Sequence, residues 1–286
     1  MTAQVTVGLD GSAESLAAVR WAAREAVLRE VPLRMVQVEE WPEAVELTGA
    51  ATLAAESRST RLLQDAADRV REDHCGLEVF TERARGRASE VLTAAVKAAD
   101  LTVLGSRGLG AAVGFLVGSV SLAVVGAAGR PVVLVRAEDG WGARADGGIV
   151  VGVDIYHPCE ALLAFGCAEG ARTGLPVRFV HSWTLPASYA YATLVNPGLG
   201  EELGGRLLGG LDDLLVPWRR RYPGVAMTAT AVEGSAAYHL VAASRRARLV
   251  VVGRRSRRVP LGPHLGHVAH AVIHHSPAPV AVVPVV

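Results

Sequence analysis

The sequence predicts two tandem α/β units, each built on a parallel sheet that carries helices on both faces. Three observations lead to this prediction. Short valine-rich runs alternate with longer helical patterns, the runs are apolar almost throughout, and the whole pattern occurs twice in 286 residues. Strands that are apolar along their full length are typical of parallel sheets buried on both sides. A chain of this length has room for two domains of ordinary size.

The second half repeats the motifs of the first. The matched positions are Asp10 with Asp154, Gly86 with Gly234, Gly105 with Gly253, and Gly118 with Gly266. These pairs lie 144 or 148 residues apart, whereas segment 36–41 (VQVEEW) resembles 178–183 (RFVHSW) at an offset of 142. Insertions in loops explain such a drift. We therefore expect one domain over 1–140 and a second over 146–286, joined near 138–147.

The elements of the first unit follow in order. Strands are expected near 4–9, 33–39, 78–84, 101–105 and 131–136, and helices near 12–29, 56–73, 87–99 and 117–127. Ser12 is a suitable N-cap for the first helix, and Glu14 lies near its positive end. Leu16, Val19 and Ala23 give this helix one apolar face.

A glycine-rich loop follows the fourth expected strand and reads G-x2-G-x9-G-S from Gly105 to Ser119. A strand, a glycine loop and a helix start together form a phosphate cradle, because glycines admit the phosphate and the free N–H groups favour an anion. The Ser119 and Ser121 hydroxyls can donate to phosphate, and Arg107 can pair with the phosphate tail. Asp10 ends the first strand and is suited to ribose hydroxyls or an adenine amine. It meets the loop if strands one and four are neighbours.

Three segments, 7–12 (VGLDGS), 99–108 (ADLTVLGSRG) and 118–121 (GSVS), resemble the universal stress protein family. The glycine pattern resembles that of its ATP-binding branch, and the resemblance covers nearly the whole chain as a tandem pair. It implies five-stranded doubly wound parallel sheets of order 3-2-1-4-5, an adenine nucleotide alpha hydrolase-like fold. It also implies dimer-like packing through the last strands, between the halves and between chains.

The resemblance further implies that ATP binds in the first unit, with the backbone of Val38 against the adenine. The candidate nucleotide-binding residues are Gly8, Leu9, Asp10, Val38, Gly105, Arg107, Gly108, Gly118, Ser119, Val120 and Ser121. Taken together, these features predict an ATP-binding stress-response regulatory protein, with or without Mg²⁺, that forms a homodimer.

The second unit departs from this pattern. Ser256 replaces the second loop glycine, His267 replaces the helix-start serine, and segment 155–156 (IY) replaces 11–12 (GS). Ser256 does not adopt a positive φ readily, and His267 fills space where a phosphate would sit. We expect this degenerate loop not to bind ATP in the same way, although its arginines can capture an anion in another geometry.

Other ligands have weaker support. The histidines between 264 and 275 are His264, His267, His270, His274 and His275. Three of them share a face if a helix begins at Gly266, which is a spacing that can bind zinc, but no cysteine or carboxylate lies nearby to complete a site. Seven arginines lie between Arg245 and Arg258, without aromatic residues among them and in a chain of net charge +1. Nucleic acid is therefore not the expected partner.

A membrane span is not expected either. Segment 108–129 has no charged residue and is long enough to cross a bilayer, but it holds six glycines and two serines. Its counterpart in the second half is rich in Arg and His. No signal-peptide pattern begins the chain, and the three cysteines lack metal-like spacing, so we expect a cytoplasmic protein.

No catalytic set accompanies the cradle. The loop has no Walker lysine, and no paired carboxylates lie near it in sequence to hold Mg²⁺. Two alternatives stay open beside the regulatory one: a nucleotide-free dimerisation or interaction scaffold, and a slow ATPase or autokinase.

Overall fold

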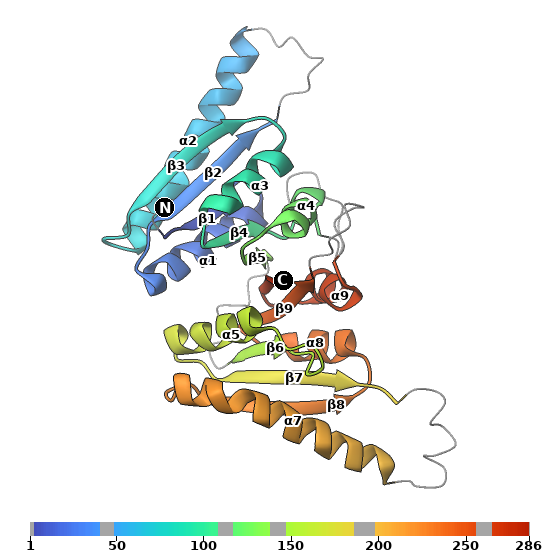
Figure 1. Cartoon of the computed structure of the whole chain (residues 1–286). Helices are drawn as coiled ribbons and strands as arrows, with labels where there is room; N and C mark the ends of the chain where they lie inside the picture. The colour runs from blue at the N-terminus through green and yellow to red at the C-terminus, as the bar shows by residue number, and fades with distance from the viewer. Residues whose placement is uncertain are drawn as a thin grey trace. The chain divides into compact units, whose positions relative to one another are not determined.

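A computed structural model describes residues 3–40, 49–107, 117–137, 147–185, 198–255 and 265–285, with the side chains of 49–56 and 255 left aside. These residues form two compact units, one on each side of segment 138–146, and each is described by itself (Figure 1). The expected linker near 138–147 lies almost wholly outside the described residues. None of the described helices is long and apolar enough to cross a membrane.

The first unit is a parallel sheet covered on both faces. Its strands are β1 (Val5–Gly8), β2 (Leu33–Glu39), β3 (Val79–Arg85), β4 (Leu101–Gly105) and β5 (Val132–Val135). Its helices are α1 (Ala13–Arg29), α2 (Gly49–Asp73), α3 (Ala88–Ala98) and α4 (Ser119–Ala127). The described strands run parallel in the order β3-β2-β1-β4-β5, which confirms the predicted fold. Helices α1 and α2 pack together on one face, and α3 and α4 on the other (Figure 1).

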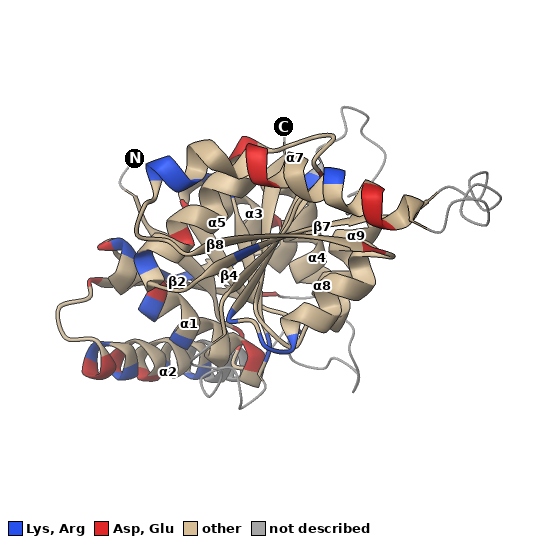
Figure 2. Cartoon of the chain, turned by 90° about the horizontal axis from the view of Figure 1, so that it is seen from below, with Lys and Arg blue, Asp and Glu red and all other residues tan. Residues whose placement is uncertain are grey.

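The burial of each element follows its sequence. β1, β4 and β5 are buried along their whole length, as continuous apolar runs predict, whereas the edge strand β3 exposes much of its length. Helix α2 carries many charged residues and α4 carries none (Figure 2). α2 begins at Gly49, seven residues before the expected start at 56, because the alanine-rich segment 49–55 (GAATLAA) continues the helix.

The second unit has the same architecture. Its strands are β6 (Ile149–Gly152), β7 (Val177–Trp183), β8 (Met227–Glu233), β9 (Leu249–Arg255) and β10 (Val280–Val285). Its helices are α5 (Glu160–Thr173), α7 (Leu199–Arg221), α8 (Ala236–Ser244) and α9 (His267–His275). The described strands are parallel in the order β8-β7-β6-β9-β10. α5 and α7 lie on one face, and α8 and α9 on the other.

Strand register fixes the correspondence between the two units. Val5 pairs with Leu33 as Ile149 pairs with Val177, so β1 and β2 match β6 and β7 at an offset of 144. β3, β4 and β5 match β8, β9 and β10 at an offset of 148, which places four extra residues between β7 and β8.

The offset of 142 expected between β2 and β7 is therefore wrong. Gly86 N–H donates to the Glu39 carbonyl, and Gly234 N–H donates to the Trp183 carbonyl in the same way. Trp183 thus occupies the place of Glu39. Trp41 and Trp183, which end the two similar segments, suggested the false alignment.

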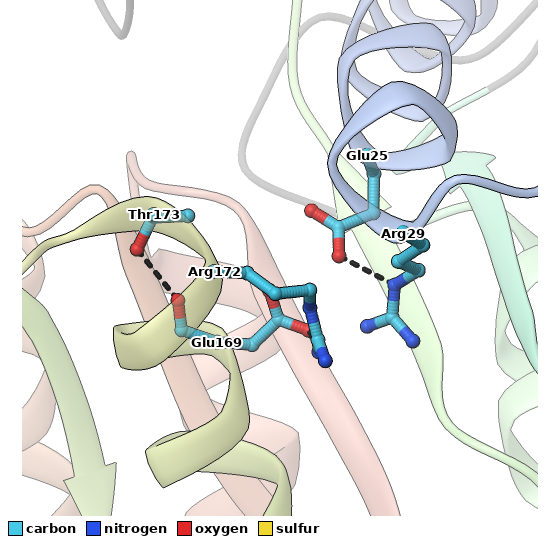
Figure 3. A network of polar contacts seen from close by, with 5 residues as sticks. All are labelled: Glu25, Arg29, Glu169, Arg172 and Thr173. Carbon is cyan, nitrogen blue, oxygen red and sulfur yellow. Dashed lines mark hydrogen bonds and ion pairs between the residues drawn. The ribbon is translucent and has the colours of Figure 1, made fainter. Parts of the chain in front are cut away.

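Each unit also buries an acidic side chain at the same place in its first helix. Glu25 of α1 is 4% exposed and pairs with Arg29 at 2.5 Å (Figure 3). Glu169 of α5 is 1% exposed and pairs with Arg172, while the Thr173 hydroxyl donates to the Glu169 carbonyl oxygen at 2.6 Å. An ion pair within the helix compensates a carboxylate that burial alone would destabilise. The repeat therefore extends to polar positions of the core.

Candidate nucleotide site

The candidate site lies where the order of the strands across the sheet reverses. From β1 the chain adds β2 and β3 on one side and then β4 and β5 on the other. β1 has β2 on one side and β4 on the other, which makes this the topological switch point of the first unit. In parallel α/β sheets, ligands bind outside the carboxyl ends of the strands at such a point. Asp10 follows β1 and Gly105 ends β4, so the structure brings these two sequence-predicted residues to the same edge of the sheet.

Asp10 builds the turn that starts α1. Its Oδ1 accepts hydrogen bonds from the Ser12 N–H at 2.9 Å and from the Ser12 hydroxyl at 2.6 Å. Ser12 is the N-cap of α1, as expected, and accepts from the Ser15 N–H at 3.1 Å. The turn also needs Gly11, whose φ of 85° lies in the left-handed region. Asp10 itself is exposed and lies just beyond the carboxyl end of β1.

The beginning of the glycine loop is tied to the first turn of α4. Ser106 N–H donates to the Val135 carbonyl at 2.7 Å, and Gly118 N–H donates to the Ser106 carbonyl at 2.8 Å. The Ser121 hydroxyl donates to the Gly105 carbonyl at 2.7 Å and is buried. A hydroxyl has one proton to donate, so Ser121 positions the loop here instead of presenting that proton to a phosphate.

Gly105 has a packing reason to be glycine. A Cβ at this position would lie 2.9 Å from the Ser15 backbone nitrogen and 3.0 Å from both the Glu14 carbonyl carbon and the Arg107 carbonyl oxygen. The absent side chain thus lets β4 approach the first turn of α1. Gly8 is similar, since its Cβ would lie 2.7 Å from the Leu104 side chain.

The start of α4 offers free N–H groups. Gly118 is its N-cap, with φ −66° and ψ 150°, and no side chain caps the helix. The first helical bond is donated by Leu122 to the Gly118 carbonyl, and among the described residues the N–H groups of Ser119, Val120 and Ser121 have no acceptor. Ser119 is exposed. Such a helix start favours an anion through both its donors and its dipole.

Arg107 is held by an acidic residue that sequence reasoning did not connect to it. Its guanidinium Nη2 lies 2.9 Å from Glu14 Oε1, and the two side chains are 23% and 13% exposed. The Ser12 hydroxyl also lies 3.5 Å from the Arg107 carbonyl oxygen. The two partners are 93 positions apart in the chain, so no local pattern signals the pair.

The remaining predicted residues flank the end of β1. Leu9 is buried and donates its N–H to the Val36 carbonyl. Backbone groups alternate in direction along a strand, so Val38, two residues further on, also points its N–H and carbonyl toward β1. Gly11 N–H turns to the Ser15 hydroxyl at 3.1 Å, so the ladder between β1 and β2 ends before the Val38 carbonyl. Gly108 lies outside the described residues.

A family model described as the universal stress protein family matches residues 1–136 and 148–284. The chain belongs to this family. A universal stress protein of Mycolicibacterium smegmatis is 32% identical over 289 residues, which cover 98% of this chain and 96% of that protein.

A solved structure of a universal stress protein shares the fold. A universal stress protein from Archaeoglobus fulgidus aligns with a TM-score of 0.70 at 17% identity, over 98% of each chain. A universal stress protein solved in complex with cAMP is 28% identical and covers 48% of this chain and 99% of its own, with a TM-score of 0.38.

The second unit of this universal stress protein keeps the aspartate turn but not the helix start beside it. Asp154 accepts from the Tyr156 N–H at 3.1 Å, as Asp10 accepts from Ser12. In the frame of the first unit α5 would begin at 157, yet it begins at Glu160 after Pro158, with Cys159 as an N-cap that makes no side-chain bond. Ile155 stands in the place of Gly11, and a β-branched residue cannot adopt the positive φ of that glycine without strain.

The counterpart of the loop differs as well. A Cβ on Gly253 would meet a Val285 methyl at 2.9 Å and no helix backbone, unlike one on Gly105. α9 begins after Gly266, which has φ −57° and ψ 151° and no side-chain cap, and His267 is exposed there. Ser256 lies outside the described residues.

The histidines of α9 do not form a described metal site. His270 and His274 have ring centroids 4.3 Å apart. Within the described ranges, no group of three or more His, Cys, Asp or Glu side chains is placed to hold a metal ion. Cys167 is buried in α5, and burial raises the pKa of its thiol to about 11, against a smaller lowering effect of Arg221. A thiol with such a pKa stays protonated and is a poor ligand or nucleophile.

Proposed function

We propose that the first unit binds an adenine nucleotide, ATP by its loop pattern, and that the protein works as a nucleotide-responsive regulator in the stress response. The observation that carries the proposal is the start of α4. It presents the N–H groups of 119–121 without a side-chain cap, and its N-cap Gly118 is tied to the end of β4 by the hydrogen bond from the Gly118 N–H to the Ser106 carbonyl. A helix start of this kind is suited to a phosphate.

The other residues supply the remaining contacts of the nucleotide. Asp10, exposed at the end of β1, accepts from the ribose hydroxyls or the adenine amine. The Val38 backbone, which points toward the end of β1, contacts the adenine edge. Arg107 pairs with the phosphate tail, and Mg²⁺ accompanies a bound triphosphate.

Regulation fits this site better than rapid catalysis. Among the described acids at this edge of the sheet, Asp10 accepts two hydrogen bonds at Oδ1 from Ser12, and Glu14 pairs with Arg107. Both carboxylates therefore have roles other than activating a water. A bound ligand changes a protein's conformation or assembly in proportion to its differential affinity for the two states. We propose that this happens in a cytoplasmic homodimer.

Proline at the first position of α4 tests the proposal. Ser119→Pro removes the Ser119 N–H and hydroxyl while leaving the helix intact, because proline is favoured at N1 and Gly118 already has the extended ψ that a residue before proline prefers. We expect ATP affinity, measured by calorimetry on the full chain, to fall about tenfold or more. Ser119→Ala removes only the hydroxyl and should have a smaller effect.

The chain contains its own matched control. His267→Pro makes the same change at N1 of α9, after Gly266 with the same extended ψ, and should leave ATP affinity unchanged. Absence of ATP binding by the unmodified protein, or equal losses in both proline variants, would contradict the proposed site in the first unit.

A further inference from the structure

The phosphate loop of the first unit has little positive charge. Between residues 105 and 129 the only charged side chain is Arg107. Helix α1, whose first turn packs against the loop, carries Glu14 in that turn. Among the described residues of this stretch, the uncapped start of α4 adds positive potential that does not depend on Arg107.

Glu14 holds that single arginine. The Glu14 Oε1 to Arg107 Nη2 distance is 2.9 Å, and both side chains are largely shielded from water. Charge-assisted hydrogen bonds of this length are strong ones, more so when partly buried. The backbone of the pair is also fixed, because Gly105 packs so closely on Glu14 and Ser15 that a Cβ would lie about 3 Å from their main-chain atoms.

The pair affects long phosphate chains more than short ones. One phosphate group is accommodated by the N–H groups at the start of α4, which do not involve Glu14. The one charged side chain of segment 105–129 that can pair with a further phosphate is Arg107. A phosphate that pairs with Arg107 lies beside the Glu14 carboxylate, which already occupies Nη2 of the guanidinium. Like charges at such short range repel strongly in a partly buried site.

We propose that Glu14 is a specificity-determining residue that weakens the binding of every phosphate beyond the first. The unmodified protein then binds AMP nearly as tightly as ATP. Occupancy of the site therefore depends on the total concentration of adenine nucleotides more than on how many phosphates each nucleotide carries. This inference rests on the proposed nucleotide site of the first unit.

The test compares AMP, ADP and ATP by calorimetry on the full-length protein and on Glu14→Gln. Glutamine keeps the size of the side chain and removes its charge. We expect ATP to gain about tenfold in affinity, ADP less, and AMP less than about twofold. Asp100→Asn is the control. Asp100 also pairs with an arginine, Arg130 at 3.6 Å, but it precedes β4 and so lies at the amino end of that strand, away from the site. This substitution should change none of the three affinities.

A double-mutant cycle adds a second readout. Arg107→Met should weaken ATP binding more in the Glu14→Gln background than in the unmodified protein, where Glu14 already holds the arginine. An unchanged ATP-to-AMP affinity ratio in Glu14→Gln, with nucleotide still bound and the circular dichroism spectrum intact, would overturn the inference while leaving the proposed function standing. Failure of all three nucleotides to bind the unmodified protein would overturn both.

Discussion

The glycines of the loop are required for different physical reasons, and only the structure distinguishes these reasons. Gly105 reads in the sequence as a residue that lets phosphate approach the backbone. In the structure its side-chain position is filled by main-chain atoms of the first turn of α1. Gly118, by contrast, is an N-cap without a capping side chain. The glycine signature therefore reflects a close packing of β4 on α1 as well as the uncapped helix start that we propose as the phosphate site.

Replacing Gly105 should destabilise the first unit even without a ligand. In Gly105→Ala the new Cβ meets backbone atoms that cannot move aside like a flexible side chain, so we expect a loss of about 1–3 kcal/mol in the free energy of unfolding, measured by denaturant titration. Gly129→Ala is the control, since nothing lies within 4 Å of its Cβ position. Equal stability of both variants would show that the close approach is not rigid.

Ser121 and Glu14 illustrate what residue types alone do not reveal. The sequence marks Ser121 as a phosphate donor, but its hydroxyl donates to the Gly105 carbonyl inside the loop. Glu14 is visible as a first-turn acid of α1, a local feature, whereas its pairing with Arg107 depends on β1 and β4 being neighbours. Contacts between residues distant in the chain follow from the fold, so side-chain partners are the part of the site that the sequence could not predict.

At the scale of elements, the first helices of the two units begin differently. α1 starts with a full set of capping bonds from Ser12 and the Asp10 turn. α5 starts three residues later in the common frame, after Cys159, which has extended dihedral angles (φ −113°, ψ 112°) and makes no side-chain cap bond. Because α5 begins later, the position that corresponds to Glu14, Pro158, precedes the helix instead of lying in its first turn.

This difference predicts a stabilising substitution. Cys159→Ser supplies a hydroxyl at an N-cap position that already has suitable backbone angles, and we expect it to raise the free energy of unfolding by about 0.5–1 kcal/mol. Ser12→Ala should lower it by about 1 kcal/mol, since it removes the cap of α1. Thermal unfolding of both variants checks the pair, and a Cys159→Ser variant less stable than the parent would contradict it.

Strands and sheet order were predictable at this scale because apolar valine-rich runs and their alternation with helices are local signals. The expected strands agree with β1–β5 to within one residue at every end. Two expectations were wrong: the start of α2, because 49–55 lacks a stop signal, and the alignment of β2 with β7. There, the resemblance of two tryptophan-terminated runs outweighed a register that only hydrogen bonds reveal.

At the scale of the whole molecule, the chain joins two equivalent sheets with unequal sites. Both sheets have an aspartate turn after the first strand and an uncapped helix after the fourth. The positive φ at Gly11, the Glu14–Arg107 pair and the approach of β4 to the first helix are features of the first unit. We therefore expect one nucleotide for each chain.

Hydrogen exchange gives a direct count of occupied sites. The N–H groups of 119–121 have no acceptor among the described residues and should exchange rapidly in the free protein. With saturating ATP we expect their exchange to slow by about tenfold or more, while the N–H groups of 267–269 at the start of α9 keep their rates. Equal slowing at both helices would indicate two sites instead of one.

The constant offset of 148 from β3 to β5 has a practical consequence. Gly86 to Val135 and Gly234 to Val283 span the same number of positions, with matching register at β4 and β9. The two segments therefore match in length and strand register and can be exchanged as a test. Transplanting the first into the second unit would move the loop, its arginine and its helix start onto a sheet of equal dimensions. Such a chimera would still lack Glu14, whose counterpart is Pro158. Its transplanted arginine would therefore have no carboxylate from the first turn of the preceding helix to pair with.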